Sequence, residues 1–193
     1  MIYVICYDWA STSGNHTGMR YLYEYIQKSN PELYKMYTFN MGGRFLDKGK
    51  RGKKISVFLT ALKLAMAYKS GDKFILTEYL HRDSYQILFA KIIRFICPKA
   101  PIYAMVHLVP EKLEGQYSKA QIKKSSRFVT EIVTLGSSLT CYLNSLGIEN
   151  VYTSFHYVDN NYYTPSANLC NRDDDVKVIV MGALARDFEQ IAY

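Results

Sequence analysis

The 193-residue sequence predicts an α/β fold in which helices cover both faces of a parallel β-sheet. The main observation is that short apolar segments, typical of buried strands, alternate with helical segments along most of the chain. Helical crossovers of this kind make the strands parallel and the connections right-handed. The composition agrees, because 49% hydrophobic and 21% charged residues exclude a disordered chain or a coiled coil. The expected architecture is Rossmann-like.

The first half of the chain is expected to form three strands and three helices. Apolar runs predict strands over 2–7, 34–39 and 73–77. Helical spacing of apolar residues predicts amphipathic helices that carry Gly18, Tyr21, Leu22 and Tyr25, then Ile55, Phe58, Leu59, Leu62 and Met66, then Tyr85, Leu88, Phe89, Ile92, Ile93 and Ile96. These helices end at Asn30-Pro31, Ser70-Gly71 and Pro98.

The second half of the chain continues the alternation. Strands are predicted over 102–107, 131–135 and 151–158, and a polar helical stretch is expected around 117–128. Ser137 is interpreted as the N-cap of a last helix, which carries Leu139, Tyr142, Leu143 and Leu146. Gly147 follows in the C′ position, where a left-handed residue commonly ends a helix.

The last part of the chain indicates a second domain. Residues 1–159 form the predicted Rossmann-like domain, and the polar segment 160–175, with Pro165 and three consecutive aspartates, is interpreted as a linker. Residues 176–193 hold a further apolar strand, a glycine turn and a helix start. Because these cannot form a domain without partner strands, we expect a domain that is truncated here or naturally missing.

The charge of the chain predicts an anionic partner. The sequence has 24 Lys and Arg against 17 Asp and Glu, which gives a net charge of +7. Nucleic acid, a phosphorylated ligand and an acidic membrane surface all meet this requirement. No signature of a nucleic-acid-binding module is present, so nucleic acid is the least favoured partner.

The cysteines and the N-terminus predict the location of the protein. Cys6, Cys97, Cys141 and Cys170 lack the spacing of a zinc site, so we expect reduced thiols and no metal. The first eight residues lack the basic start of a signal peptide, and no apolar run approaches the roughly 18–20 residues of a membrane span. The expected location is the cytoplasm, with peripheral attachment to the inner face of the membrane as a further expectation.

The loop after the first strand has the residues of an anion site. Open α/β sheets bind ligands at the carboxyl ends of their strands. Gly14, Asn15, His16 and Gly18 come directly before a helix, where free backbone N–H groups attract an anion. The loop matches neither a Walker A sequence nor Gly-x-Gly-x-x-Gly. A helix cap with a turn would use the same residues, and both interpretations stay open.

The loop after the second strand is strongly basic. Its cations, against one acidic residue, are Arg44, Lys48, Lys50, Arg51, Lys53 and Lys54. A solvated loop is the default interpretation of such a run. The third helix adds further cations among large apolar residues, namely Arg82, Lys91, Arg94 and Lys99. An anionic membrane surface is therefore the alternative interpretation.

His107 ends the fourth predicted strand, where a buried strand meets the ligand-facing loops. A single histidine is usually structural, but this position favours a catalytic role. Glu78 and His81 follow the third strand and are expected on the same side of the sheet. No Gly-x-Ser-x-Gly elbow is present, so Ser–His–Asp hydrolysis is not predicted.

A series of motifs near the end of the chain follows a known order. They are Leu135-Gly136-Ser137-Ser138, Leu146-Gly147-Ile148, Val158-Asp159, Tyr162-Tyr163-Thr164-Pro165 and the strand that ends in Gly182. This order resembles the end of the first domain and the linker of GT-B glycosyltransferases, particularly the large retaining family four. The resemblance is most specific over residues 131–187.

The resemblance implies the N-terminal half of a GT-B fold, with an active site between two Rossmann-like domains. The first domain would bind the acceptor, a glycan or a lipid-linked sugar, on the side of Glu78 and His81. The second domain would bind the donor, a UDP- or GDP-sugar, which is a co-substrate, and no cofactor is expected. The loop from Gly14 to Gly18 would lie under the donor diphosphate, and His107 would donate a hydrogen bond to a sugar hydroxyl.

The sequence also departs from the family. Tyr157 stands where a glycine usually precedes Val-Asp, and Ala183 and Phe188 stand near the family's Arg and Lys-Gly positions. Arg186 is the remaining cation that could meet a diphosphate. The implied activity is that of a hexosyltransferase, with the 193-residue chain inactive alone because the donor site is missing. The alternative is a standalone α/β module that binds anionic membranes or polymers.

Overall fold

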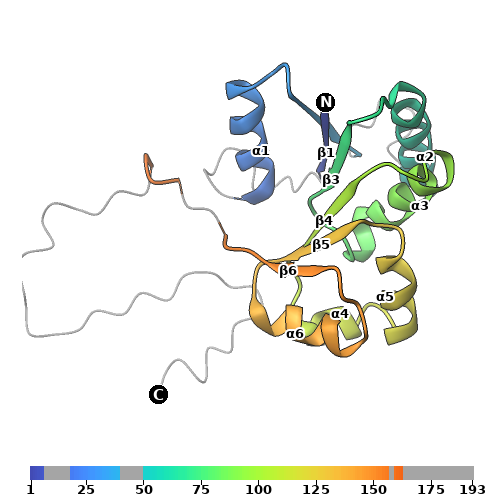
Figure 1. The fold of residues 1–193 in the computed structure, drawn as a ribbon, viewed down its shortest axis with the longest axis vertical. Helices are drawn as coiled ribbons and strands as arrows, with labels where there is room; N and C mark the ends of the chain where they lie inside the picture. Colours follow the sequence, from blue (N-terminus) through green and yellow to red (C-terminus); the bar gives the residue numbers. More distant parts are fainter. Residues whose placement is uncertain (7–17, 40–49, 157–158, 163–193) are drawn as a thin grey trace, which may run out of the picture. The chain divides into compact units, whose positions relative to one another are not determined.

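A computed structural model of the chain describes residues 1–6, 18–39, 50–156 and 159–162 (Figure 1). The chain divides into two compact units, Met1–Asp159 and Asn160–Tyr193. Of the second unit, only residues 160–162 are described, and they form a turn. Residues 163–175 of the linker predicted over 160–175, and the predicted strand and helix start over 176–193, therefore lie outside the described residues.

The first unit is built on six parallel strands in the order β2-β1-β3-β4-β5-β6. The strands are β1 (Ile2–Cys6), β2 (Tyr34–Thr38), β3 (Lys73–Leu76), β4 (Ile102–Val106), β5 (Glu131–Thr134) and β6 (Val151–Thr153). Each matches a predicted strand. The predicted α/β, Rossmann-like fold class is confirmed.

The sixth strand is shorter than the sequence predicts. Its pairing with β5 ends at Thr134 and Thr153, and one more hydrogen bond joins the N–H of Ser154 to the Thr134 carbonyl at 2.8 Å. Among the described residues, β6 is an edge strand, and its last two residues are exposed. Because β5 itself ends at Thr134, the pairing stops there, and the prediction of a strand was wrong for residues 154–156, while residues 157 and 158 lie outside the described residues. His156 consequently lies after the strand.

Helices lie on both faces of the sheet (Figure 1). Helix α1 (Gly18–Ser29) joins β1 to β2, and α2 (Lys50–Ala67) joins β2 to β3 in the opposite direction along the sheet. Because such crossovers are right-handed, the reversal puts α1 and α2 on opposite faces. The later connections cross the sheet in the same direction as the connection from β2 to β3, so their helices lie on the same face as α2. These helices are α3 (Gln86–Ile96), α4 (Pro110–Glu114), α5 (Lys119–Ser126) and α6 (Ser137–Ser145).

The main core lies between the sheet and the α2–α6 face. Alternate strand residues are fully buried there, among them Phe74, Leu76, Ile102, Ala104, Val106 and Ile132. The ring of Phe89 on α3 lies 5.9 Å from that of Phe74 and 5.7 Å from that of Phe39, measured between centroids. This packing fixes α3 against β3, and with it the position of the loop that joins them.

The α1 face is covered over a smaller area. Val4 and Cys6 of β1 and Met19 of α1 are buried there, outside the main core cluster. Tyr23 of α1 donates a hydrogen bond to the sulfur of Met105 on β4 at 3.5 Å. Helix α1 therefore reaches as far as the middle of the sheet.

Helix α2 forms as predicted, but it faces the core with a different set of residues. The side chains that pack inward are Val57, Ala61, Leu64 and Ala65. Four residues of the predicted stripe are instead 49–73% exposed, namely Ile55, Phe58, Leu59 and Met66. Both faces of the helix are apolar, so periodicity could not select one. The alanines permit close approach to the sheet, which decides the orientation.

The caps and bounds predicted for the other helices were partly correct. Gly147 has φ 73° at the C′ position, as predicted, and the N–H of Ile148 donates to the Leu143 carbonyl at 3.2 Å. The N-cap of α6 is Gly136, so the prediction of Ser137 as the cap was wrong. The predicted helix over 117–128 is shorter, because Tyr117 precedes the cap of α5. A short helix, α4, precedes it, and α5 starts with a Ser118–Gln121 capping box.

Within the described ranges, no helix has both the length and the apolarity needed to cross a bilayer.

Candidate functional site

The carboxyl ends of β1 and β3 meet where the connections of the sheet diverge. From β1 the chain crosses to β2 at one side, and from β3 it continues to β4 at the other. Open α/β sheets bind ligands in the crevice that such a divergence leaves. Residues 7–17, which follow β1, lie outside the described part of the chain. The described wall of this crevice therefore comes from the ends of β1, β3 and β4.

A buried glutamine ties the loop after β3 to β1. Gln86 is fully buried, and its Nε2 donates to the Ile5 carbonyl at 2.8 Å. Its Oε1 accepts from the backbone N–H of Glu78, also at 2.8 Å. Thr77 donates its hydroxyl to the same Ile5 carbonyl at 3.2 Å. These bonds satisfy polar groups that are costly to bury alone, and they fix the path by which the chain leaves β3.

Two residues other than glycine have left-handed backbone conformations between β3 and α3. Leu80 has φ 57° and Tyr85 has φ 55°, a conformation that costs L-residues about 1–2 kcal/mol each. The loop is held in place by Tyr79, whose N–H donates to the Met105 carbonyl and whose hydroxyl donates to the Ser125 carbonyl, both at 2.8 Å. Strain that the surroundings enforce in this way is concentrated at functional sites in proteins.

His107 follows β4 directly and is held against the end of β3. Its Nε2 lies 2.7 Å from the carbonyl oxygen of Thr77. Because a carbonyl oxygen can only accept, the ring donates from Nε2, and a neutral ring keeps Nδ1 as an acceptor. Burial lowers the pKa of His107, the hydrogen bond to Thr77 opposes this shift, and nearby His156 lowers the pKa further. His107 is therefore a neutral imidazole at pH 7.

This geometry changes the hydrogen bond that the resemblance implies for His107. The implied bond ran from the ring to a sugar hydroxyl. In the neutral ring, Nε2 is already used by Thr77, so Nδ1 would accept from a hydroxyl instead. The sequence could not reveal this, because the tautomer is set by a carbonyl 30 residues away in the chain.

His156 lies close to His107. Their ring centroids are 6.5 Å apart with an interplanar angle of 68°. His156 is exposed, whereas His107 is partly buried. Of these two histidines, the sequence analysis selected only His107, because the predicted strand over 151–158 placed His156 inside the sheet. The shorter β6 leaves His156 in the segment that follows the strand, at the carboxyl edge.

The thiol of Cys6 belongs to the same region but is not a nucleophile at neutral pH. Cys6 ends β1 and is 1% exposed. Burial raises its pKa to about 12, although a hydrogen bond with Thr77 acts in the opposite direction. A thiol with this pKa stays protonated, and only the thiolate reacts readily. Chemistry at this edge would use the imidazole and carboxylate groups.

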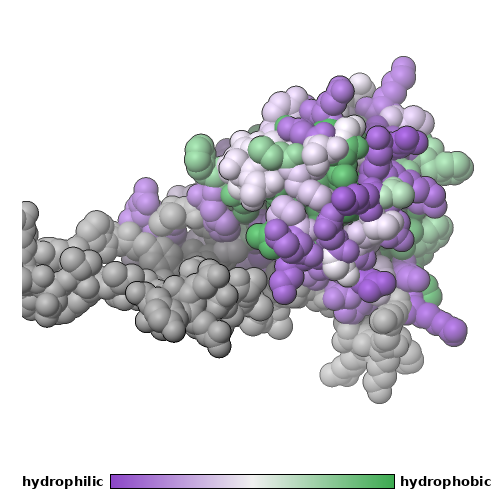
Figure 2. Space-filling view, turned by 90° about the horizontal axis from the view of Figure 1, so that it is seen from below, coloured by the Kyte–Doolittle hydropathy of each residue, from purple (hydrophilic) through white to green (hydrophobic). Residues whose placement is uncertain are grey.

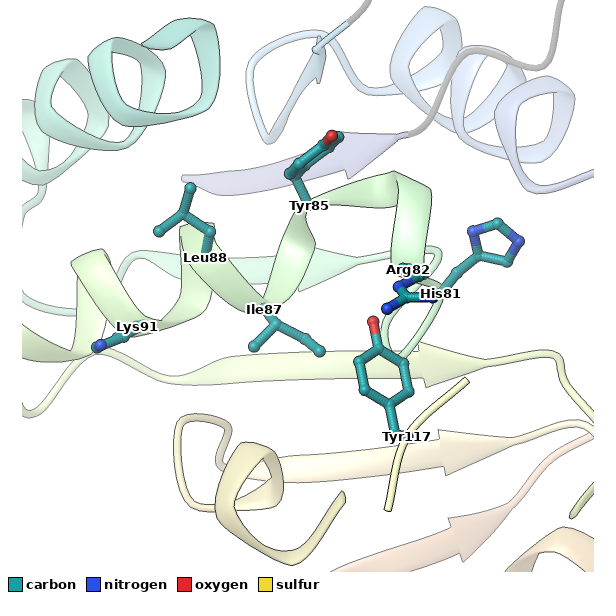
Figure 3. A pocket seen from close by; sticks show the side chains of 7 residues that line it. All are labelled: His81, Arg82, Tyr85, Ile87, Leu88, Lys91 and Tyr117. Carbon is teal, nitrogen blue, oxygen red and sulfur yellow. The ribbon is translucent and has the colours of Figure 1, made fainter. Parts of the chain in front are cut away.

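A pocket of about 310 Å³ opens beside the loop between β3 and α3 (Figure 3). It is lined by His81, Arg82, Tyr85, Ile87, Leu88, Lys91 and Tyr117. Tyr117 points its hydroxyl towards the guanidinium of Arg82, and Leu88 and Lys91 lie at the far end (Figure 3). The floor is thus apolar, and cations stand at both ends. The volume is at the small end of the range for ligand pockets.

The acceptor-side residues lie in two neighbouring places. Glu78 follows Thr77, whose carbonyl holds His107, so Glu78 and His107 belong to the same end of the sheet. His81 is three residues further on and lines the pocket. The loop between β3 and α3 therefore connects the crevice to the pocket.

The residues predicted for the anion loop and the basic loop are only partly described. Gly18 is the first residue of α1 and has φ 79°. Gly14, Asn15 and His16 of the predicted anion loop and Arg44 and Lys48 of the predicted basic loop lie outside the described ranges. Arg186, predicted to meet the donor diphosphate, also lies outside them. The basic loop was predicted to include residues 50–54, and this is wrong. Lys50, Arg51, Lys53 and Lys54 belong to the first turns of α2.

Three residues of the site were missed by the sequence analysis. Thr77 and Gln86 build the bonds that hold the crevice, and Tyr117 lines the pocket. Gln86 gave one usable signal, because it is a lone amide on the otherwise apolar inner face of α3. Tyr117 gave none, because its position depends on the tertiary packing of the segment between α4 and α5.

No family model, no curated protein and no solved structure matches this chain. The resemblance to GT-B glycosyltransferases therefore stays a prediction, and the fold itself is assigned from its topology.

Proposed function

We propose that residues 1–159 are the acceptor-binding domain of a glycosyltransferase that uses a nucleotide sugar. In such a transfer, the bond between the sugar C1 and the nucleoside diphosphate breaks, and a bond from C1 to an acceptor oxygen forms. The nucleoside diphosphate leaves, and the acceptor hydroxyl loses its proton. The acceptor would be a glycan or a lipid-linked sugar, and the reaction would take place in the cytoplasm or at the inner face of the membrane.

The observation that carries this proposal is the state of His107. A neutral imidazole at the carboxyl end of β4, with Nε2 engaged and Nδ1 left as an acceptor, suits a ligand that offers hydroxyl groups. Carbohydrates offer many such groups. The strained loop beside it and the pocket with Arg82 and Tyr117 add polar and apolar contacts of the kind that a sugar ring uses.

A binding experiment with the 193-residue chain tests this function. The probes are a short-chain lipid-diphosphate-linked sugar, the free sugar, UDP-glucose and GDP-mannose. We expect the acceptor probes to shift the NMR resonances of the His107 ring, and the nucleotide sugars to have little effect, because the proposal assigns the donor site to a second domain. No shift with any probe would contradict the proposal. Turnover of a nucleotide sugar by this chain alone would contradict the need for a second domain.

Two variants separate a binding role of His107 from a structural one. In His107→Gln the side-chain amide can still donate to the Thr77 carbonyl, but its Oε1 acceptor does not occupy the position of the ring Nδ1. We expect His107→Gln to keep the fold and to weaken acceptor binding about tenfold, the value of one good hydrogen bond. In His107→Phe both bonds are lost. Equal acceptor affinity in the wild type and in His107→Gln would show that the histidine is structural.

A further inference from the structure

The outer surface of α2 and α3 exposes large apolar side chains. Phe58 on α2 is 50% exposed, and Phe95 and Ile96 near the end of α3 are 86% and 42% exposed. They line an open groove of about 680 Å³ together with Leu88, Ile92 and Phe128. The stripe continues along α2 through Ile55, Leu59 and Met66. Figure 2 shows hydrophobic side chains among hydrophilic ones on the side of the molecule where α2 and α3 lie.

The same two helices carry only positive charge. Neither contains an acidic residue, and their cations are Lys50, Arg51, Lys53, Lys54, Lys63, Lys91 and Arg94. These are seven charges, equal to the net charge of the whole chain, so the remaining acidic and basic residues cancel. The four cations in the first turns of α2 also lie at the positive end of the helix dipole, which adds to the positive potential at that end of the helix.

We infer that this α2–α3 surface docks on an anionic phospholipid membrane. The exposed phenylalanines and aliphatic side chains would enter the interfacial layer, while the lysines and arginines would contact the lipid phosphates. This combination of an apolar stripe and flanking cations is what interfacial binding requires, because each cation adds to the attraction of an anionic surface. The inference does not depend on the proposed transferase activity.

Two other occupants fit the surface less well. A second copy in a two-fold contact would bring fourteen cations together without one acidic side chain from either pair of helices. Nucleic acid would match the charge. However, the groove is lined by apolar side chains and two cations, and it offers no amide or hydroxyl group to the base edges.

Arg94 is already engaged within the protein. Its Nη1 donates to the Pro98 carbonyl at 2.6 Å, and its Nε donates to the Phe128 carbonyl at 3.2 Å. Both acceptors are neutral, so the positive charge of Arg94 is kept at the rim of the groove. Lys91 is exposed on the same helix. Arg94 would therefore fix the shape of the groove, and Lys91 would meet the lipid.

Vesicle sedimentation of the 193-residue chain tests the inference. One set of vesicles contains phosphatidylglycerol and phosphatidylcholine in equal parts, and the other contains phosphatidylcholine alone. We expect sedimentation with the anionic vesicles only, and a loss of binding as salt is raised. An absence of binding to the anionic vesicles at low salt would overturn the inference. Equal binding to both sets would overturn the role of the charges.

Matched variants locate the contact. Phe58→Ser with Phe95→Ser should reduce the partition coefficient about tenfold or more, whereas Phe155→Ser should leave it unchanged. Phe155 is a suitable control because it is 93% exposed but belongs to the segment after β6. Lys54→Glu with Lys91→Glu should also reduce binding at least about tenfold, and the exposed pair Lys28→Glu with Lys112→Glu should reduce it less.

The variants also distinguish a membrane from the other partners. All substituted side chains are exposed, so thermal unfolding should be unchanged and a loss of binding cannot be attributed to misfolding. Equal loss in the test and control variants would overturn the assignment to the α2–α3 surface. Binding to single-stranded RNA, or self-association through the same residues, in place of vesicle binding would overturn the membrane partner.

Discussion

The carboxyl edge of the sheet and the α2–α3 surface differ in what they leave unsatisfied. At the carboxyl edge, the buried polar groups of Gln86 and Thr77 have partners within the chain. On the α2–α3 surface, Phe58 and Phe95 keep half or more of their surface in water. A buried polar group needs a hydrogen-bond partner within the folded chain, because burying it unpaired costs free energy. An exposed apolar side chain can be covered later, when a partner binds. The first region is thus built for precise positioning, and the second for docking.

The largest expected effect separates two phenylalanines of the same helix. Phe89 is fully buried against Phe39 and Phe74, and Phe95 is 86% exposed. We expect Phe89→Ala to lower the free energy of unfolding by about 3–5 kcal/mol, because it leaves a cavity in the core. Phe95→Ala should change it by less than about 0.5 kcal/mol. Chemical denaturation followed by circular dichroism measures both, and similar losses would contradict the assigned orientation of α3.

A smaller effect is expected from the buried amide. Gln86→Leu would leave the N–H of Glu78 without its partner and should lower the free energy of unfolding by about 1–3 kcal/mol. The control is Gln116→Leu, because Gln116 accepts from the N–H of Arg82 at 2.9 Å in an exposed position, where water can replace it. If the two variants were equally stable in urea titrations, the buried bonds of Gln86 would not hold the loop.

The ionisation of His107 predicts a pH dependence of stability. Its pKa is lowered in the folded chain, chiefly by burial, so below about pH 6.5 the unfolded chain binds the proton more readily. Stability is therefore complete above that pH and falls as the pH drops towards the folded pKa. Urea unfolding between about pH 7.5 and pH 5 measures the slope. His107→Phe should flatten it, and an unchanged slope in this variant would assign the effect to other groups.

The smallest expected effect concerns thiol reactivity and leaves the fold unchanged. Cys6 is buried with a pKa raised to about 12, and Cys141 is exposed. Iodoacetamide at about pH 8 should modify Cys141 in the native chain and leave Cys6 intact. Mass spectrometry of the peptides measures the two rates, and denaturant should make them similar. Modification of Cys6 at the rate of Cys141 in the native chain would show that the end of β1 is open.

Features of the site that depend on neighbouring residues in the sequence could be predicted, and those that depend on residues far apart in the chain could not. The sequence placed Glu78, His81 and His107 at the carboxyl edge because each follows an apolar run that predicts a strand, and the ends of parallel strands share an edge. Their bonding could not be found. Gln86 bonds to Ile5, 81 residues earlier, and His107 bonds to Thr77, 30 residues earlier. No local pattern records which buried polar groups will pair.

Helix α2 shows the limit of periodicity in the fold itself. Its sequence contains two apolar stripes, and the one with the larger side chains was the obvious candidate for the core. The structure buries the stripe with Ala61 and Ala65 and leaves Phe58 and Met66 exposed. Large side chains would hold α2 away from the sheet, and small ones permit dense packing. The exposed stripe then becomes available for docking.

The sequence alone determined the class of the fold, because alternating apolar strands and helical crossovers allow few arrangements other than a parallel sheet. It also determined the net positive charge and the positions of the polar residues that end the strands. Only the tertiary structure decided which face of α2 meets the core, which nitrogen of His107 is engaged and where the charge collects. These depend on packing and on hydrogen bonds between distant segments, which no local sequence window contains.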